Sequence, residues 1–303
     1  MDGTVSEGTV DVPVAGGTLR VGVRGGDPGS SRDASAALLV HGITSSHLAW
    51  DFVAERLPDV TLIAPDLRGR GMSRTVAGPA GLAAHAADLA ATLDRLGIGQ
   101  TVVVGHSMGG FVAVVFAHLY PERVSRLLLV DGGLPLDVDP RLSTDDVISG
   151  VLGPTAARLA MQFASLDDYL AFWHRHPAFA DDWSTRLDEY FAYDLVDDGA
   201  GALRPATAYE TVVADVADMN GGATLPAALA QLRHPARLIT VSRGLQNEEP
   251  GMYSPGYLDR VLPTYPGIRH ERIDGVNHYR IVMSDAGADV VAQALREELA
   301  ARG

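Results

Sequence analysis

The fold is decided by the stretch Thr101-Val-Val-Val-Gly105-His106-Ser107-Met108-Gly109-Gly110-Phe111. The continuous apolar run before Gly105 is typical of a buried strand, and the apolar residues after Gly110 have helical spacing. Gly105 and Gly109 stand two residues on either side of Ser107, where side chains would clash in a sharp turn. We therefore predict a strand, a tight turn and a helix, with the Ser107 hydroxyl projecting from the turn. The free N–H groups and the dipole of that helix favour an anion at the same point.

Short apolar runs alternate with longer segments of helical spacing along much of the chain. Two strands joined at Gly16-Gly17 form a predicted hairpin, followed by a loop from Gly25 to Ser35. The hairpin and the other predicted strands are Thr9–Val14, Thr18–Val23, Ala37–Val40, Val60–Ala64, Thr101–Val104, Arg126–Val130, Ala236–Val241 and Glu271–Ile273. Helices are predicted at His47–Leu57, Leu82–Leu96, Met108–Leu119 and about Ala286–Ala300. This alternation predicts an α/β protein with right-handed crossovers and a mostly parallel sheet covered on both faces.

The alternation stops between Pro135 and Leu232. This segment is acidic, has helical spacing, and contains the aromatic residues Phe172, Trp173, Trp183, Tyr190 and Tyr193. We interpret residues 135–232 as a helical cap inserted into a core domain made of residues 1–134 and 233–303. The aromatic side chains are expected either to line a pocket over Ser107 or to form the small core of the cap itself, since large rings supply most of the burial in a small helical unit.

The composition excludes several classes of function. With 303 residues, 47% hydrophobic and 20% charged, the chain can bury one large core with an inserted subdomain. A net charge of -14 without any Arg-rich run argues against nucleic acid as a partner. The absence of cysteine excludes disulfides, thiol catalysis and thiolate metal sites. No metal site is expected either, because the pairs His174/His176 and Asp137/Asp139 lack further converging donors.

The sequence also bears on where the protein resides. The segment Met1–Val14 carries acidic residues and has no basic region followed by an apolar core, so we do not expect a secretory signal. The longest apolar runs, such as Phe111–Ala117, are too short to span a membrane. We expect a soluble, cytoplasmic protein with no membrane partner, and its oligomeric state is left open.

On these segments the chain resembles the α/β-hydrolase fold superfamily over nearly its whole length. The matching pieces are Leu38-Leu-Val-His-Gly42, Pro65-Asp-Leu-Arg-Gly-Arg-Gly-Met-Ser73, the turn around Ser107, and Gly275-Val-Asn-His278. The resemblance implies an eight-stranded, mostly parallel sheet flanked by helices, an inserted helical cap, and Ser107 as the nucleophile. It also implies an oxyanion hole formed by the backbone N–H groups of Ile43 and Met108. His41 is expected to hold its loop through side-chain hydrogen bonds.

The base and the acid follow from position within this resemblance. Of ten histidines, His278 lies in a Gly/Asn loop after an apolar strand, where the superfamily carries its catalytic histidine. The commonest place of the acid holds Asn247, and an amide cannot carry the charge that stabilises an imidazolium. Two carboxylates remain open: Asp131, at a strand end used by some branches of the superfamily, and Glu248, one residue beyond the common place. We favour Asp131, because a strand end is rigid whereas Glu248 requires a shift of its loop.

Together these residues predict a serine hydrolase that cleaves a carboxylic ester or lactone through an acyl-enzyme on Ser107, with a small apolar substrate and no cofactor. A serine at the turn argues against epoxide hydrolase and dehalogenase chemistry, which require a carboxylate there. The resemblance leaves three alternatives: hydrolysis of a carbon–carbon bond in a vinylogous diketone, a cofactor-free perhydrolase, and a non-catalytic receptor that binds a small molecule.

Overall fold

The computed structural model describes residues 8–26, 36–139 and 141–301. The first seven residues of the segment Met1–Val14 and residues 27–35 of the predicted loop Gly25–Ser35 lie outside the described residues. Within the described ranges, no helix combines the length and the apolar character needed to cross a membrane.

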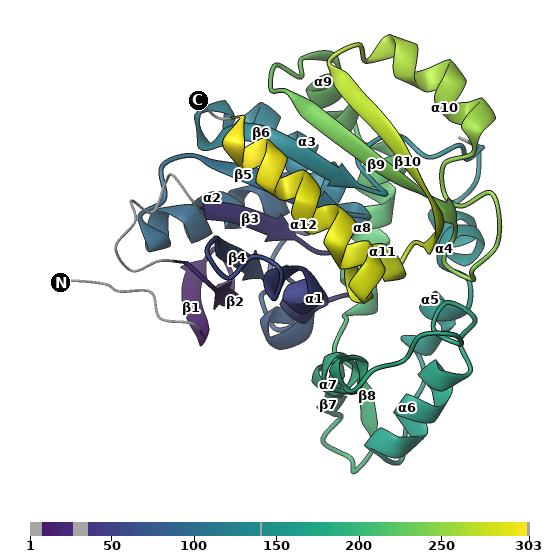
Figure 1. The fold of residues 1–303 in the computed structure, drawn as a ribbon. Coiled ribbons are helices and arrows are strands. Elements are labelled where there is room, and N and C mark those ends of the chain that lie inside the picture. The colour runs from purple at the N-terminus through teal and green to yellow at the C-terminus, as the bar shows by residue number, and fades with distance from the viewer. Residues whose placement is uncertain (1–7, 27–35, 140, 302–303) are drawn as a thin grey trace.

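The centre of the molecule is an eight-stranded sheet in the order β1-β2-β4-β3-β5-β6-β9-β10 (Figure 1). Its strands are β1 (Gly8–Val14), β2 (Gly17–Arg24), β3 (Ala36–Val40), β4 (Thr61–Pro65), β5 (Thr101–His106), β6 (Val124–Val130), β9 (Ala236–Arg243) and β10 (Ile268–Asn277). β2 runs antiparallel to both β1 and β4, and the other neighbouring strands pair in parallel. The predicted mostly parallel sheet is confirmed, and each predicted strand overlaps one of these eight.

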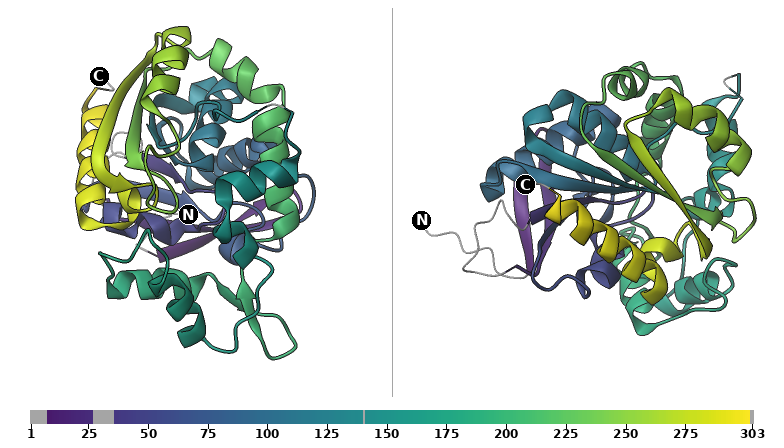
Figure 2. Two further views of the ribbon diagram at one scale, coloured as in Figure 1. Left: turned by 90° about the vertical axis from the view of Figure 1, so that its right-hand side faces the viewer. Right: turned by 45° about the horizontal axis from the view of Figure 1, so that its top comes forward.

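Helices cover both faces of the sheet. Successive residues of a strand point to opposite faces, and because the residues on both faces are apolar, each face needs a cover. Leu38 and Val40 of β3 join an apolar cluster with α2 (Leu82–Leu96) and α3 (Met108–Leu119). Ala37 and Leu39 join a second cluster with α1 (Asp51–Ala54), α11 (Arg280–Met283) and α12 (Asp285–Ala300). Figure 2 shows α12, in yellow, lying along the sheet. Shorter elements are η1 (His47–Trp50), η2 (Gly71–Ser73), η3 (Pro121–Arg123), η4 (Leu262–Thr264) and α10 (Pro255–Val261).

The described residues between β6 and β9 form six helices and a small hairpin. The helices are α4 (Thr144–Leu152), α5 (Pro154–Arg158), α6 (Leu166–His174), α7 (Thr185–Tyr193), α8 (Tyr209–Gly221) and α9 (Thr224–Ala230). Figure 1 shows α5, α6 and α7 grouped at one end of the molecule, whereas α8 contacts α4 and α9 packs against α3. The hairpin pairs β7 (Leu195–Asp197) with β8 (Leu203–Pro205). Our interpretation of this segment as helical missed the hairpin, because three-residue strands are too short to show an alternating pattern.

Most of the aromatic rings of this segment pack on one another. Trp173 stacks on Phe191 with ring centroids 4.3 Å apart, and Trp183 stacks on the same ring at 5.5 Å. Trp173 and Phe191 are buried in the cluster that also contains α12. Tyr190 belongs to the same cluster and also lines a pocket beside Ser107. These rings therefore form chiefly a core, and Tyr190 faces the pocket.

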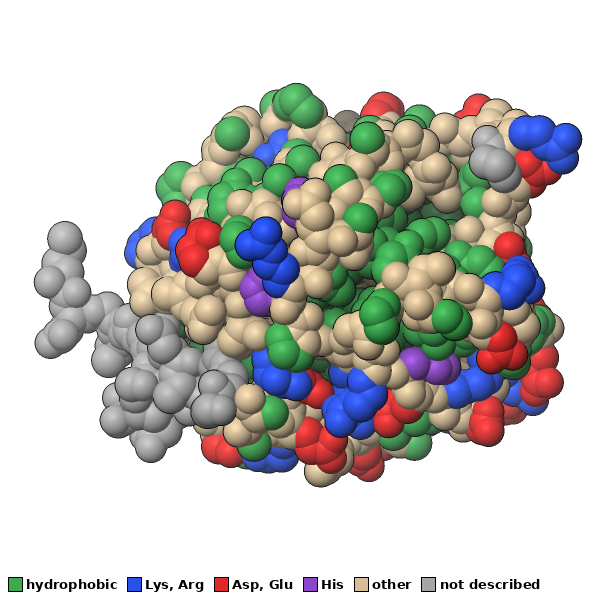
Figure 3. All heavy atoms as spheres, turned by 90° about the horizontal axis from the view of Figure 1, so that it is seen from above, with side chains coloured by type: hydrophobic (Ala, Val, Ile, Leu, Met, Phe, Trp, Pro, Cys, Tyr) green, Lys and Arg blue, Asp and Glu red, His purple; other side chains and the backbone are tan. Residues whose placement is uncertain are grey.

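The surface carries both signs of charge. Figure 3 shows a face on which acidic and basic side chains are interspersed, with hydrophobic side chains lining a hollow.

Candidate active site

Ser107 occupies the sharp turn between β5 and α3. Its backbone has φ of 55° and ψ of −126°, a conformation that is strained for a residue with a side chain. Hydrogen bonds hold it there: the Ser107 N–H donates to the carbonyl of Val130 at 3.0 Å, and the Ser107 carbonyl accepts from the N–H of Gly110 at 2.9 Å. The turn is thus fixed by the neighbouring strand and by the helix that follows it.

Glycines around Ser107 allow backbone segments to approach closely. A Cβ atom on Gly105 would lie 2.2 Å from the carbonyl oxygen of Gly109, and one on Gly109 would lie 2.0 Å from the carbonyl oxygen of Val40. On the other side, a Cβ atom on Gly132 would lie 2.0 Å from the carbonyl oxygen of Ser107. The predicted requirement for small residues at the turn therefore has a direct steric cause.

His278 and Asp131 meet at the carboxyl ends of the strands that precede them. The Nδ1–H of His278, just after β10, donates to Oδ2 of Asp131, just after β6, at 2.6 Å. Both side chains are buried, and Oδ1 of Asp131 also accepts the N–H of Val241 at 3.3 Å. A buried carboxylate in this position orients the imidazole and stabilises the positive charge that the ring acquires when it takes a proton.

Glu248, the alternative acid, is directed elsewhere. Its side chain is exposed, and Oε2 accepts the N–H of Gln246 within the same loop at 2.7 Å. Asn247 accepts a hydrogen bond from Nδ2 of Asn277 at 3.2 Å, which links this loop to the residue before His278. The structure thus brings Asp131, and not Glu248, to His278.

Ile43 and Met108 lie beside Ser107. A Cβ atom on Gly42 would lie 3.2 Å from the Cβ of Ser107, so the backbone entering Ile43 passes directly along the serine. Met108 is the first residue of α3, where backbone N–H groups have no partner within the helix. The expected role of His41 agrees with its contacts: Nε2 accepts the N–H of Leu67 at 2.9 Å and Nδ1–H donates to the carbonyl of Gly42 at 2.7 Å.

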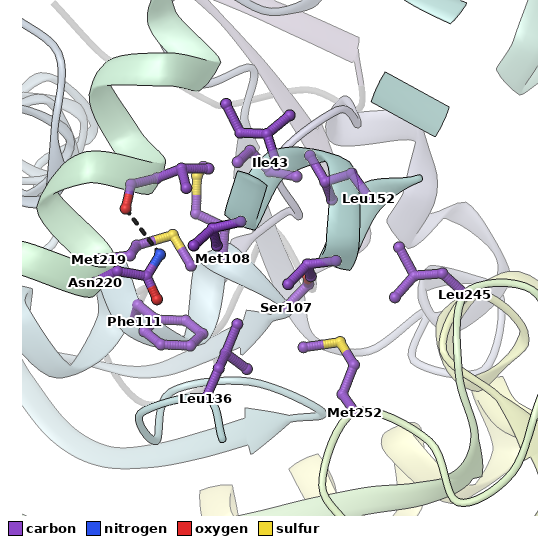
Figure 4. Close-up of a pocket in the computed structure, with 14 residues that line it drawn as sticks. Ile43, Ser107, Met108, Phe111, Leu136, Leu152, Met219, Asn220, Leu245 and Met252 are labelled. Carbon is purple, nitrogen blue, oxygen red and sulfur yellow. Dashed lines mark hydrogen bonds between the residues drawn. The ribbon is translucent and has the colours of Figure 1, made fainter. Parts of the chain in front are cut away.

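Two pockets meet at Ser107, and Ile43, Leu152 and Leu245 line both of them. The apolar pocket is drawn in Figure 4 and extends between α3, α4 and α8. It encloses about 430 Å³ of space, part of which is open to solvent. Its further lining is Met108, Phe111, Leu136, Val147, Ile148, Val151, Val216, Met219, Asn220 and Met252. The second pocket is called the polar pocket because a larger share of its lining is polar than in the first, and it encloses about 400 Å³ of space that is partly open to solvent. It is completed by Gly42, Thr44, Ser45, His106, Tyr190, His278, Tyr279 and Met283.

Sequence reasoning missed two residues that contact the site. Nε2–H of His106 donates to the backbone carbonyl of His278 at 2.9 Å. Burial, followed by the charge of His278, holds the pKa of His106 well below its ordinary value, so this ring stays neutral. The second is Arg70, which contacts both Ile43 and Met108. Both residues stand in segments already singled out from the sequence, but spacing alone does not reveal the partners of a side chain.

Parts of this sequence are similar to the sequences of known proteins. It is 40% identical over 128 residues to the lipase LipV of Mycobacterium tuberculosis, a match that covers 40% of this chain and 47% of that protein. It is 42% identical over 102 residues to N-formylmaleamate deformylase of Pseudomonas putida, covering 32% of this chain and 37% of that protein. The chain therefore spans less than half the length of these two relatives.

The fold is shared over a longer range. The crystal structure of E-2-(acetamidomethylene)succinate hydrolase superposes with a TM-score of 0.74 at 19% identity, covering 96% of this chain and 99% of that one. A likeness at this level of identity shows the fold alone. The sequence model of the family described as alpha/beta hydrolase fold matches residues 38–201, which include both Ser107 and Asp131. Since this match takes in more than half of the 303 residues, the chain belongs to the alpha/beta hydrolase fold family.

Proposed function

We propose that the protein is a serine hydrolase that cleaves carboxylic esters or lactones through an acyl-enzyme on Ser107. The observation that carries the proposal is the 2.6 Å hydrogen bond between His278 and Asp131, next to a serine held on a strained turn. Because Nδ1–H of His278 is bound to Asp131, Nε2 is the nitrogen that can accept a proton. His278 and Ser107 line the same pocket.

The reaction proceeds in two halves. Nε2 of His278 takes the proton of Ser107 as its oxygen attacks the carbonyl carbon, and the N–H groups of Ile43 and Met108 hold the resulting oxyanion. When the C–O bond breaks, His278 returns the proton to the leaving oxygen. A water molecule, deprotonated by the same ring, then attacks the acyl group, and His278 returns this proton to the Ser107 oxygen as the acid is released. Asp131 orients the ring of His278 and stabilises the imidazolium.

The position of His278 indicates which pocket holds the acyl group of the ester and which holds the leaving group, because His278 returns the proton to the leaving oxygen. The leaving oxygen must lie within hydrogen-bond reach of His278. His278 belongs to the described lining of the polar pocket and is absent from that of the apolar pocket. The leaving group therefore occupies the polar pocket, near Ser45 and Tyr190, and the acyl group enters the apolar pocket. This arrangement favours an apolar acyl chain joined to a small polar leaving group.

Labelling with a fluorophosphonate tests whether Ser107 is activated. The wild-type protein is expected to bind one equivalent of the probe at Ser107, and Ser107→Ala none, because only a serine with a general base reacts readily. A receptor without an activated serine would not be labelled. Labelling without turnover of any ester or lactone would contradict ester cleavage and favour the carbon–carbon hydrolase or perhydrolase alternatives, each assayed on its own substrate.

Turnover of p-nitrophenyl esters of graded acyl length tests the pocket assignment. We expect kcat/KM to rise with chain length until the apolar pocket is filled. Met219→Trp should move the optimum to shorter chains, because the larger ring occupies space now open to the acyl group. Met161→Trp is the matched control, since Met161 is 40% exposed and lies outside the lining of both pockets. The same shift in both variants would contradict the assignment.

A further inference from the structure

Arg70 is a fully buried cation that contacts both residues of the proposed oxyanion hole. Its Nε–H donates to the carbonyl of Ile43 at 2.8 Å, and Nη1–H donates to the carbonyl of Arg68 at 2.9 Å. Nη2 lies 3.8 Å from Sδ of Met108. With an exposed fraction of 0%, this guanidinium has exchanged its water for these contacts.

The counter-charge of Arg70 comes from helix α8. Nη2 of Arg70 lies 2.6 Å from Oδ2 of Asp215, which is equally buried. The other oxygen of Asp215 accepts the N–H of Gly81 at 2.8 Å and lies 3.0 Å from Nε2 of His85. Burial by itself raises the pKa of Asp215, but the charges of Arg70 and then His85 outweigh burial and lower that pKa well below its ordinary value. The pair is therefore charged, and each partner is costly to leave alone.

Helix α8 also forms a wall of the apolar pocket. Val216, directly after Asp215, lines that pocket, and so does Met219 one turn further. An acyl group in the pocket therefore contacts the same helix whose carboxylate holds Arg70. Arg70 itself is absent from the described lining of both pockets, so it can act on the reaction only through the groups that it holds.

We propose that Arg70 is a positioning residue that fixes the oxyanion hole relative to Ser107. Through Asp215, Arg70 also couples the position of the oxyanion hole to the position of α8. This inference rests on the proposed function. Oxyanion donors must lie within about 2.7–3.1 Å of the place where the negative charge develops, so a small shift of the backbone weakens them. Arg70 restrains the loop of Ile43 by bonding the carbonyl of Ile43, and it restrains the start of α3 by contacting Met108. Its charge is balanced by Asp215 of α8, the helix that an acyl group in the apolar pocket would contact.

The chain offers a matched control in Arg68. This side chain is 4% exposed, stands in the same loop, and pairs with Asp88 through Nη2 at 2.7 Å and Nε at 2.7 Å. Its remaining bonds go to carbonyls such as that of Pro79, and not to Ile43 or Met108. Arg70→Met and Arg68→Met therefore both remove a buried, paired arginine, but only the first releases the oxyanion residues.

The test compares kcat, KM and the affinity for an alkylboronic acid, which forms a tetrahedral adduct with an active serine. Relative to Arg68→Met, we expect Arg70→Met to lower kcat for a p-nitrophenyl ester by about 10- to 100-fold while KM changes little, the pattern of an interaction made in the transition state. The boronic acid should bind more weakly by a similar factor. Arg70→Lys should recover thermal stability through Asp215 without recovering kcat, because one ammonium cannot replace the planar fork of donors.

The outcomes separate the inference from the function on which it rests. Equal losses of kcat in Arg70→Met and Arg68→Met, or a loss of kcat without weaker boronic acid binding, would overturn the positioning role while the wild-type enzyme remains active. A wild-type protein that neither reacts with fluorophosphonate nor turns over esters would overturn the proposed function as well. If Arg70→Met does not fold, Arg70→Lys is compared with Arg68→Lys by the same measurements.

Discussion

Backbone strain in this molecule is concentrated at the candidate site. Among the described residues, the non-glycine positions with left-handed φ are Ser107 at 55°, Asp131 at 44° and Asn247 at 64°. Ser107 is the proposed nucleophile, and Asp131 forms a hydrogen bond with His278. Asn247 accepts a hydrogen bond from Asn277, the residue before His278. Strained backbone persists where the surrounding structure over-determines it, and such residues cluster at functional sites. The three angles therefore support the site independently of its hydrogen bonds.

Substitution of Asp131 tests the acid. We expect Asp131→Asn to lower kcat by about 10⁴-fold, because an amide cannot stabilise the imidazolium or select the ring tautomer that leaves Nε2 free. Asparagine tolerates left-handed φ, so the fold should survive the change. Glu248→Gln is the control and should leave kcat nearly unchanged, since that carboxylate bonds within its own loop. Steady-state kinetics and circular dichroism check both variants, and similar losses of kcat in the two would refute the assignment.

At the scale of elements, the unit that matters is the strand, turn and helix around Ser107. α3 approaches β3 so closely that a Cβ atom on Gly109 would meet the carbonyl of Val40 at 2.0 Å. That atom is rigid backbone, so either the helix or the strand would have to move. The turn that presents Ser107 therefore depends on backbone packing between elements, in addition to the local conformation of the turn.

Replacing glycines in two helices tests this packing. We expect Gly109→Ala to lower the free energy of unfolding by about 3 kcal/mol, because the clash with Val40 cannot be relieved by a side-chain rotation. Gly150→Ala, in α4, should instead raise it by about 0.5–1 kcal/mol, since Gly150 is exposed with open space around it and alanine favours the helix. Urea unfolding measures both. An equal loss in Gly150→Ala, where no atom lies in the way of the new methyl group, would mean that the clash with Val40 is not the cause of the destabilisation.

The elements were predictable where their own residues determine them. Leu82–Leu96 is a helix over the predicted range, because its apolar spacing spans four turns. The predicted helix His47–Leu57 is instead η1 followed by α1 and ends at Ala54, ahead of Pro58. Its start is set by Asp66, whose Oδ1 accepts both the N–H and Nδ1–H of His47 at 2.8 Å. A contact of this kind between distant segments leaves no local pattern.

At the scale of the whole molecule, buried polar groups join segments that are distant in sequence. The resemblance to the α/β-hydrolase fold predicts Ser107, His278 and Asp131 from their places after recognisable strands, with Glu248 left open as the acid. The pairing of Arg70 with Asp215 could not be predicted, because Asp215 lies within a helix whose apolar spacing says nothing of its partner. The same holds for His106 and the carbonyl of His278. What sequence reasoning leaves out is therefore the set of buried contacts that fix the site after the elements have formed.

These buried groups predict how stability depends on pH. Burial is the main cause that lowers the pKa of His41 from 6.5 to about 3, and it also lowers that of His106. Between these values the unfolded chain binds a proton on His41 and the folded protein does not, so the free energy of unfolding falls as pH drops below about 6.5. The slope from His41 near pH 5 is about 1.4 kcal/mol per pH unit.

His41→Asn isolates this contribution. The amide reaches as far as Nδ1 of His41 and can still donate to the carbonyl of Gly42, but it does not titrate. We expect the variant to be less stable at pH 7, because it fills the site less well, yet to lose stability more slowly between pH 6.5 and 4.5. Urea unfolding across this range measures the two slopes. Parallel curves would mean that His41 takes up its proton equally in both states and that its burial does not govern acid stability. A difference of about 1.4 kcal/mol per pH unit would show that the histidine beside the oxyanion loop is neutral in the folded protein.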